Sequence, residues 1–184
     1  MKPLTQITIA CFLLSSCANI VMPTGGEKDI IPPKLLKTFP KNNTTNFNDK
    51  SILFEFDENI AVNKWIDHFS ISPLTEKPIK YKIKNSTLKI ELENQLKENT
   101  TYSINLNKCV KDINEGNVLD DLNFSFSTGN FLDSLFISGK VLDALTLRPK
   151  SNVKVFLHGS NVHDSLSFET RPKYVTKTNE NGSF

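Results

Sequence analysis

The fold of this chain is decided by residues 79–92, which read IKYKIKNSTLKIEL. Apolar side chains take every second position on either side of Asn85 and Ser86, with lysine or glutamate at most positions between them. Alternation with a period of two is typical of a strand that buries one face and exposes the other. A polar dipeptide between two such runs is typical of a tight turn. The stretch therefore predicts an antiparallel hairpin.

The same alternation recurs on both sides of this hairpin. Further runs lie at 35–39, 52–56, 69–71, 102–106 and 122–126. Together with the hairpin they make about seven strands, the number expected of an Ig-like β-sandwich. The windows of helical spacing, near 63–68 and 92–98, are short. We therefore predict an all-β fold, in which the 13 phenylalanines fill the space between two sheets.

A second β unit is predicted over residues 135–184. Its apolar runs are 135–142, 153–157, 165–168 and 174–176. Asn181-Gly182-Ser183, near the end of the sequence, has the composition of a hairpin turn whose return strand is missing. A sandwich of only a few strands keeps an open edge and an uncovered apolar face. We therefore expect an incomplete second β-sandwich, and a protein that continues beyond Phe184.

The first 16 residues have the pattern of a signal peptide, with Lys2, an apolar run over 7–14 and then two serines. The run is shorter than the roughly 20 residues that a membrane-spanning helix needs. Leu14-Ser15-Ser16-Cys17 resembles a bacterial lipobox, which implies cleavage before Cys17 and a lipid on that cysteine. Because acyl chains contribute about 0.8 kcal/mol per buried methylene, they would hold the protein on a membrane. The alternative is an ordinary secretory signal with a chance cysteine.

The segment behind Cys17, residues 17–30, is predicted to be a flexible tether. It is rich in small and turn-prone residues, with Gly25 and Gly26 loosening it and Pro32-Pro33 stiffening the chain just beyond it. A folded unit could therefore stand off the membrane surface.

The cysteines and the charge balance exclude other classes of protein. Cys11 lies in the predicted signal peptide and Cys17 would carry lipid, which leaves Cys109 without a disulfide partner. Free cysteine is among the most buried residue types, so we interpret Cys109 as a core residue rather than a nucleophile or metal ligand. The net charge of +2, from 22 basic and 20 acidic residues, leaves no basic stripe for a phosphate backbone. Nucleic acid is not an expected partner.

Several short motifs resemble one protein family. They are CANIVMPTGGEKDIIPP (17–33), FEFDE (54–58), LKENTTY (96–102), DINEGN (112–117) and FSTG (126–129). Together they resemble Bacteroidetes outer-membrane lipoproteins with an SbsA-type bacterial Ig-like domain, here over residues 31–129. Residues 138–141 and 179–184 resemble parts of a carboxypeptidase-regulatory-like, transthyretin-type domain, here over residues 135–184.

The resemblance implies a lipid-anchored protein of the outer membrane with no known catalytic activity and no cofactor. Surface-displayed lipoproteins of this phylum often carry several acidic residues close behind the cysteine. Here only Glu27 and Asp29 follow, rather late. The membrane face, periplasmic or outer, therefore stays open.

Three groups of residues carry chemistry that could indicate a site. Asp112, Asn114 and Gly116 have nearly the spacing that opens a calcium loop. The glycine is one position early and no glutamate closes the loop, so we favour a turn with Asx hydrogen bonds. His158, His163 and Asp164 could suggest a metal site, but no further ligand clusters with them, so we favour surface residues. Asp57 and Glu58 are adjacent on a predicted strand and would face opposite ways.

Two serines are candidates for modification. Asp133-Ser134-Leu135 and Asp164-Ser165-Leu166 resemble the acceptor motif for O-glycosylation in the same phylum. The pattern is only three residues long, and two unmodified surface serines are the alternative.

These observations predict a non-catalytic envelope protein whose Ig-like domain is a structural spacer or an interaction module. Its partners would be the membrane, through the lipid, and an envelope protein or polysaccharide. One alternative is a polysaccharide-binding module, for which Trp65 and Tyr81 are the first candidates because aromatic faces stack on sugar rings. Another is an accessory region of an enzyme whose catalytic part lies beyond Phe184.

Overall fold

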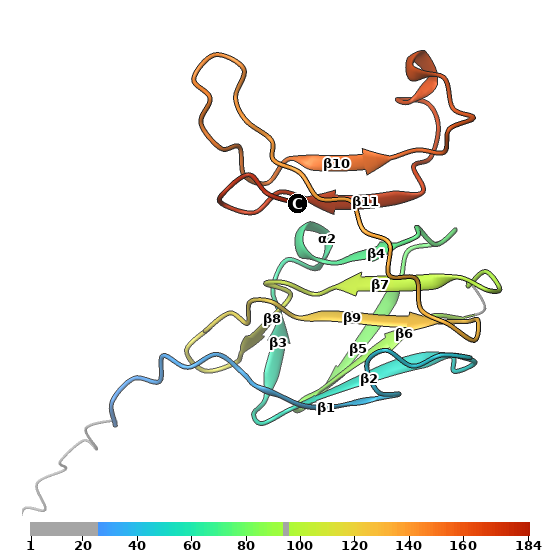
Figure 1. Cartoon of the computed structure of the whole chain (residues 1–184). Helices are drawn as coiled ribbons and strands as arrows, with labels where there is room; N and C mark the ends of the chain where they lie inside the picture. Colours follow the sequence, from blue (N-terminus) through green and yellow to red (C-terminus); the bar gives the residue numbers. More distant parts are fainter. Residues whose placement is uncertain (1–25, 94–95) are drawn as a thin grey trace, which may run out of the picture.

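The computed structural model describes residues 26–93 and 96–184 of the chain; the signal peptide, the lipobox and Cys17 lie outside the described residues. Short strands follow one another in antiparallel pairs and gather into two units joined by a linker after β9 (Figure 1). The predicted all-β class is confirmed.

The first sheet contains the predicted hairpin. Its order is β1-β2-β6-β5, formed by Leu35–Phe39, Ser51–Phe56, Thr87–Glu91 and Lys80–Lys84. All its pairs are antiparallel, and β5 and β6 are joined at Asn85, which has φ 54°. On the outer face of the hairpin, Lys82 Nζ lies 2.7 Å from Glu91 Oε1. The lysines of β5 make this edge a poor template for pairing with another chain.

The second sheet faces the first. Its order is β4-β7-β9, formed by Ser70–Ser72, Thr101–Asn105 and Asn123–Ser127. The chain that leaves β1 crosses to this sheet and runs parallel to β9, where the N–H of Asn43 donates to Ser125 O (2.8 Å) and the N–H of Ser127 donates to Thr44 O (2.9 Å). The segment after β1 therefore covers the β9 edge and ties the two sheets together.

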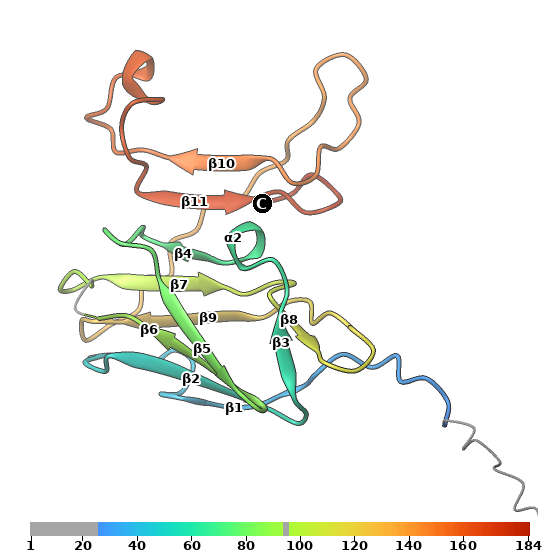
Figure 2. The ribbon, with the colours of Figure 1, turned by 180° about the vertical axis from the view of Figure 1, so that it is seen from behind.

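A two-stranded ribbon closes one end of the sandwich. It consists of β3 (Ile60–Val62) and β8 (Val110–Asp112) in antiparallel register. The four-residue helix α2 (Trp65–His68) follows β3 and begins after Lys64, whose φ of 43° turns the chain (Figure 2).

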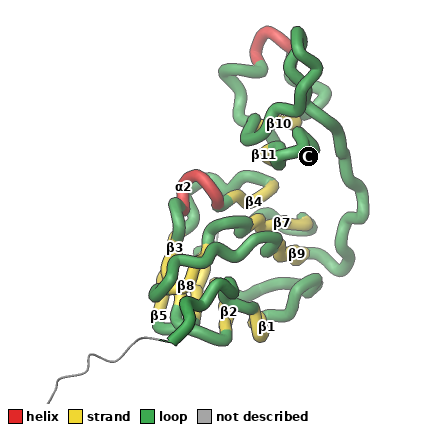
Figure 3. Tube along the Cα trace, turned by 90° about the vertical axis from the view of Figure 1, so that its left-hand side faces the viewer, coloured by secondary structure: helices red, strands yellow, loops and turns green. Residues whose placement is uncertain are grey.

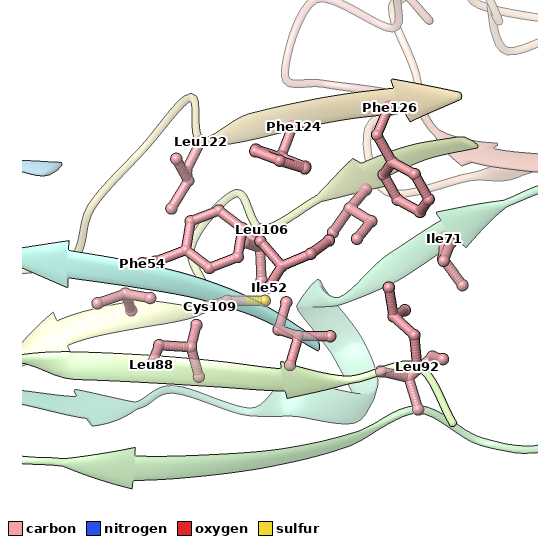
Figure 4. Close-up of a cluster of buried hydrophobic side chains, with 14 of the residues drawn as sticks. Ile52, Phe54, Ile71, Leu88, Leu92, Leu106, Cys109, Leu122, Phe124 and Phe126 are labelled. Atoms are coloured by element: carbon pink, nitrogen blue, oxygen red, sulfur yellow. The ribbon is translucent and has the colours of Figure 1, made fainter. Parts of the chain in front are cut away.

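The core lies between the two sheets and belongs entirely to the first unit. The alternating apolar positions of β2, β6, β7 and β9 point inward, as Figure 4 shows for Ile52, Phe54 and Leu88 from one sheet and Phe124 and Phe126 from the other. The Phe54 and Phe124 rings meet edge to face with centroids 5.3 Å apart, which adds to the burial of their apolar surface. All buried hydrophobic side chains of the described residues lie between Phe47 and Phe126.

The second unit is thinner. It has one antiparallel ribbon, β10 (Lys154–Leu157) with β11 (Tyr174–Lys177), and the 3₁₀ helix η1 (Asp164–Leu166). None of the described hydrophobic side chains after Phe126 is buried, and Phe168 is 98% exposed. The apolar positions of this unit thus have little to pack against.

Two strands predicted for the second unit are wrong. Residues 165–166 belong to η1 and 167–168 to the turn that follows it, because the His163 side chain accepts a hydrogen bond from the Ser165 N–H and local bonding is favoured over a strand that has no partner. Residues 135–142 form no regular strand: they make only the single bridges Lys140 with Ser183 and Leu142 with Pro149, and backbone hydrogen bonds at Gly139 and Val141.

The predicted turn at residues 181–183 does form. Gly182 has φ +73°, and a Cβ at this position would meet the Val141 carbonyl oxygen at 2.5 Å, so glycine is required on both grounds. The chain beyond the turn pairs with Gly139, since each residue of the Gly139–Phe184 pair donates its N–H to the other's carbonyl at 3.1 Å.

Candidate functional site at the junction of the two units

The second unit docks on the free edge of the first unit's β4 strand. Ser72 Oγ donates to Val175 O at 3.1 Å and accepts from the Val175 N–H at 3.2 Å. The N–H of Leu74 donates to Lys173 O at 3.4 Å. Residue numbers rise along β4 from Ser72 to Leu74 while those of their partners fall from Val175 to Lys173, so β11 lies antiparallel to β4 (Figure 1). The Ser72 side chain thus joins β11 to the edge of the second sheet.

Charged side chains bridge the two units around this seam. The Arg171 guanidinium donates to Thr75 O and the Lys177 ammonium donates to Asp67 O. Lys108 Nζ lies 3.8 Å from Glu180 Oε1, an exposed pair that contributes little by itself. The linker adds a covalent strap along one side of the molecule (Figure 3), and the N–H of its Asp133 donates to Thr101 Oγ1 at 2.9 Å.

A cleft of about 1150 Å³ opens beside the seam, between α2 and β4 of the first unit and β10 and β11 of the second. Its acidic lining residues are Asp67, Glu76, Asp120, Asp121 and Glu180. Its basic lining residues are Lys77, Lys108, Lys154, Arg171 and Lys177. The formal charges of the cleft therefore cancel.

Uncharged polar groups make up much of the remaining lining. The amides are Asn105, Asn107, Asn152, Asn179 and Asn181. The N–H of Asn107 donates to Asn105 Oδ1 at 3.0 Å, whereas Asn107 Oδ1 is buried and has no hydrogen-bond partner in the described part of the chain. A buried acceptor without a donor costs about 1–3 kcal/mol. Such an atom needs an explanation.

His68 lies in the wall of the cleft. Burial and the nearby Lys177 ammonium lower the pKa of this imidazole below its ordinary value of 6.5. The lowered pKa favours the neutral imidazole, which adds no charge to the cleft.

Trp65 and Tyr81, proposed from the sequence as a sugar platform, do not offer a row of open faces. Trp65 stacks on Phe69 with ring centroids 4.1 Å apart and an interplanar angle of 12°. The Tyr81 ring centroid lies 4.2 Å from that of Trp65, with an interplanar angle of 32°. Since two rings at these distances must take opposite faces of the indole, only its edge is left. The platform interpretation is corrected: Trp65 is the middle ring of a structural stack.

The Asp112 carboxylate closes a turn. Its Oδ1 accepts from the N–H groups of Glu115 (2.7 Å) and Gly116 (2.8 Å), and its Oδ2 accepts from Asn117 (2.8 Å). Burial opposes ionisation, but these donors outweigh it and hold the pKa of Asp112 below its ordinary value of 3.8. The carboxylate acts as an internal turn acceptor, as the turn interpretation requires.

The same turn holds the entry of the chain into the first unit, a role that the sequence did not reveal. Asn117 Nδ2 donates to Asp29 O (3.1 Å) and to Ile31 O (3.3 Å). The N–H of Lys34 donates to Asp57 Oδ1 at 2.8 Å. Asp57 therefore helps to hold the chain where it enters the first unit.

The pKa of neighbouring Glu58 is raised, first by burial and then by the Asp112 charge.

The remaining candidates stay apart. His158 Nδ1 lies 3.4 Å from Thr170 Oγ1, and His163 Nδ1 lies 2.9 Å from Ser165 Oγ. Within residues 26–93 and 96–184, no three His, Cys, Asp or Glu side chains come together as a group that could hold a metal ion. Ser134 is exposed on the extended linker. Cys109 is fully buried, and burial raises the pKa of its thiol to about 12.

Tyr102 identifies the type of sandwich. It lies near the start of β7, is 1% exposed, and its hydroxyl oxygen accepts a 2.8 Å hydrogen bond from the N–H of Lys97, five residues upstream. This is the tyrosine corner found near the start of a late strand in Ig-like sandwiches. A family model described as a bacterial Ig-like domain matches residues 29–128. The chain belongs to the bacterial Ig-like domain family.

The bacterial Ig-like domain also has likenesses among solved structures. The S-layer protein rSbsC(31-844) is 18% identical with a TM-score of 0.34; the match covers 83% of this chain and 18% of that one. An L,D-transpeptidase from Mycobacterium smegmatis is 10% identical with a TM-score of 0.35, and the match covers 81% of this chain and 74% of that one. No curated protein matches. In the described part of the chain, no helix has the length and apolar character needed to cross a membrane.

Proposed function

We propose that this protein is a non-catalytic cell-envelope lipoprotein in which the bacterial Ig-like domain is a structural spacer or interaction module. The observation that carries the proposal is the placement of the two connections. The N-terminal segment enters the domain beside β1, β3 and β8, whereas the second unit lies on the opposite side, on β4 (Figures 1 and 2). A domain of this arrangement separates the N-terminal segment from the second unit.

The proposed layout assigns residues 1–16 to a signal peptide and 17–30 to a tether lipidated at Cys17. The Ig-like domain then spans 31–129, and a carboxypeptidase-regulatory-like, transthyretin-type unit spans 135–184. The lipobox resemblance supports an outer-membrane location, and the antiparallel pairing of β10 with β11 is compatible with the second unit.

Fixed connections at both ends support a spacing role. Asn117 holds residues 29–31 at the entry. Ser72, Arg171 and Lys177 hold the second unit at the exit. Because both connections include hydrogen bonds to backbone groups, they fix the orientation of the entering chain and of the second unit relative to the domain.

Metabolic labelling with an alkyne fatty acid tests the anchor. We expect the wild-type protein to be labelled and to sediment with membranes, and Cys17→Ala to abolish both. Cys109→Ala is the matched control, because Cys109 is buried in the core, and it should keep the label. Label on Cys17→Ala, or wild-type protein found only in the soluble fraction, would contradict the proposal.

A distance measurement tests the spacer. Spin labels at Lys28 and at exposed Glu169, in a Cys109→Ala background without Cys11 and Cys17, report the distance across the domain. We expect one narrow distribution in the full chain. A broad distribution would show that the domain does not fix the separation of its neighbours.

Of the two serines proposed for O-glycosylation, Ser134 is the better placed. It is exposed on an extended segment, whereas the Ser165 hydroxyl is hydrogen-bonded to His163 within η1. Mass spectrometry of protein from the native host should find a glycan on the peptide that carries Ser134. Modification of Ser165 alone would contradict this order.

A further inference from the structure

We propose that the cleft at the junction of the two units binds a neutral oligosaccharide. This binding role goes beyond the spacing role and does not depend on a lipid anchor. It rests on the size of the cleft, its charge balance, its polar groups and its apolar walls.

The cleft has the position and size of a ligand site. Small-molecule sites commonly lie between domains and measure about 300–1,000 Å³. At about 1150 Å³, this cleft lies just above that range. It therefore has room for more than one sugar ring.

The charge balance indicates a neutral ligand. Five acidic and five basic side chains line the cleft and cancel formally. A polyanion or polycation is favoured by a surface of one sign, which this cleft lacks. A neutral polyhydroxylated ligand meets no net repulsion and can hydrogen-bond to both kinds of group.

The amides supply the matching donors and acceptors. Each asparagine offers a carbonyl acceptor and two N–H donors, and a sugar hydroxyl is both donor and acceptor. Asn107 lines the cleft, and its Oδ1 is buried without a partner among the described residues. Turning this amide towards the cleft would let the oxygen accept a hydrogen bond from a ligand hydroxyl.

The apolar part of the lining comes from both units. Ile66 of α2 is 93% exposed and Phe156 of β10 is 51% exposed, and both line the cleft. Exposed apolar side chains next to polar groups suit a sugar ring, which has an apolar C–H face and a polar rim. An extended peptide would instead pair with a free strand edge, and the β4 edge beside the cleft is already bridged to Val175 through Ser72. The observations therefore favour the sugar.

Calorimetric titration of the full chain with defined hexasaccharides tests the proposal. The neutral probes are cellohexaose, xylohexaose, maltohexaose and chitohexaose, and hexagalacturonate is the acidic comparator. We expect at least one neutral probe to bind at millimolar concentration or below, and hexagalacturonate to bind at least about tenfold more weakly.

Two variants with matched controls locate the site. Asn107→Ala and Phe156→Ala should each weaken binding of the neutral probe about fivefold or more. Asn114→Ala and Phe168→Ala, which remove the same side chains outside the cleft, should leave it unchanged. Thermal melts monitor folding, and Phe156→Ala keeps the test informative if Asn107→Ala is unstable, since Phe156 is half exposed.

Three outcomes would overturn the proposal. The first is that none of the neutral hexasaccharides binds. The second is that hexagalacturonate binds as tightly as the best neutral probe. The third is that the cleft variants and their controls weaken binding equally, which would place the ligand elsewhere on the protein.

Discussion

Ser72 Oγ contacts both backbone polar groups of Val175, donating to its carbonyl oxygen at 3.1 Å and accepting from its N–H at 3.2 Å. One hydroxyl thus occupies the place of a rung in a β-ladder between β4 and β11. It satisfies both backbone polar groups of Val175 on the facing strand, and the junction cleft opens beside it. The docking of the second unit therefore depends on a side chain that a single substitution removes.

Ser72→Ala should loosen the second unit without weakening the first. The Val175 groups lose their partner, at a cost of about 1–3 kcal/mol if they remain buried, so the undocked state gains population. Limited proteolysis should then cut the linker at residues 130–137 several-fold faster than in the wild type. Ser103→Ala, a hydroxyl in the same row on β7, is the control and should be cut at the wild-type rate. Equal cutting of wild type and Ser72→Ala would show that the hydroxyl does not hold the junction.

Tyr102→Phe should destabilise the first unit by about 0.5–1.5 kcal/mol, because the Lys97 N–H loses its acceptor while the buried ring is retained. Urea denaturation followed by circular dichroism measures the difference. Tyr174→Phe removes a hydroxyl from a 42% exposed ring and should change stability by less than about 0.5 kcal/mol. A Tyr102→Phe protein as stable as the wild type would mean that the corner is not a structural element.

Most strands of the first unit were predictable because their apolar residues alternate and a facing sheet covers them, whereas the three-residue strands β3 and β8 are too short to show the alternation. Phe54 and Phe124, fully buried on opposite sheets, are examples. In the second unit alternation failed at residues 165–168, because Leu166 and Phe168 have no facing sheet and the local bonds of His163 decide the conformation. Periodicity predicts a strand only where a partner is available.

The junction was not predictable from the sequence. Its cleft is lined by residues from both units, and no local pattern links Asn107 to Phe156. The prediction that Trp65 offers an open face to a sugar ring was wrong, because the sequence does not show that Phe69 and Tyr81 pack against its indole. The Asp112 turn was predicted from its spacing, but its hold on the entering chain through Asn117 is a long-range contact.

Phe54→Ala should cost about 3–5 kcal/mol, since the side chain is fully buried and packs on Phe124. Against a typical total of about 5–15 kcal/mol, the cooperative thermal transition should fall steeply or vanish. Phe168→Ala removes the same side chain from a 98% exposed position. Its free energy of unfolding should stay within about 0.5 kcal/mol of the wild-type value. If both variants melt alike, the inward face of β2 is assigned wrongly.

Cys109 should be unreactive until the first unit unfolds. Burial raises the pKa of its thiol from 9.0 to about 12, so at about pH 8 the folded protein has roughly a thousandfold less thiolate than an unfolded chain. With Cys11 and Cys17 replaced by alanine, a disulfide reagent should label Cys109 only as fast as the protein opens. Urea should accelerate labelling in parallel with the loss of circular dichroism. Fast labelling of the folded protein would contradict the buried position.

The same raised pKa predicts alkaline sensitivity. A thiol that is neutral in the fold and ionises more easily when unfolded favours the folded state below pH 9.0, and this contribution is lost as pH rises towards about 12. Tyr102, whose pKa burial also raises, adds to the loss in this range. Cys109→Ala should therefore lose less stability than the wild type between these pH values, measured by urea titration. Parallel losses in the two proteins would assign the effect to other groups.

Residues 135–184 should not fold when expressed alone. None of the described hydrophobic side chains of this segment is buried even with the first unit present, and Leu135, Leu145 and Phe168 are each more than 90% exposed. Ordering a residue costs about 1.5 kcal/mol, and a segment of this length seldom offsets that without a disulfide or metal. Its sequence has no cysteine.

Amide NMR spectra measure this directly. The isolated segment should give narrowly dispersed signals, whereas the β10 and β11 amides of the full chain should be dispersed and protected from exchange, because Ser72 and the charged bridges of the seam order them from outside. Ser72→Ala in the full chain is the intermediate case and should reduce that protection without altering the β2 and β6 amides. Dispersed signals from the isolated segment would show that the second unit carries its own core and that the seam joins two independent folds.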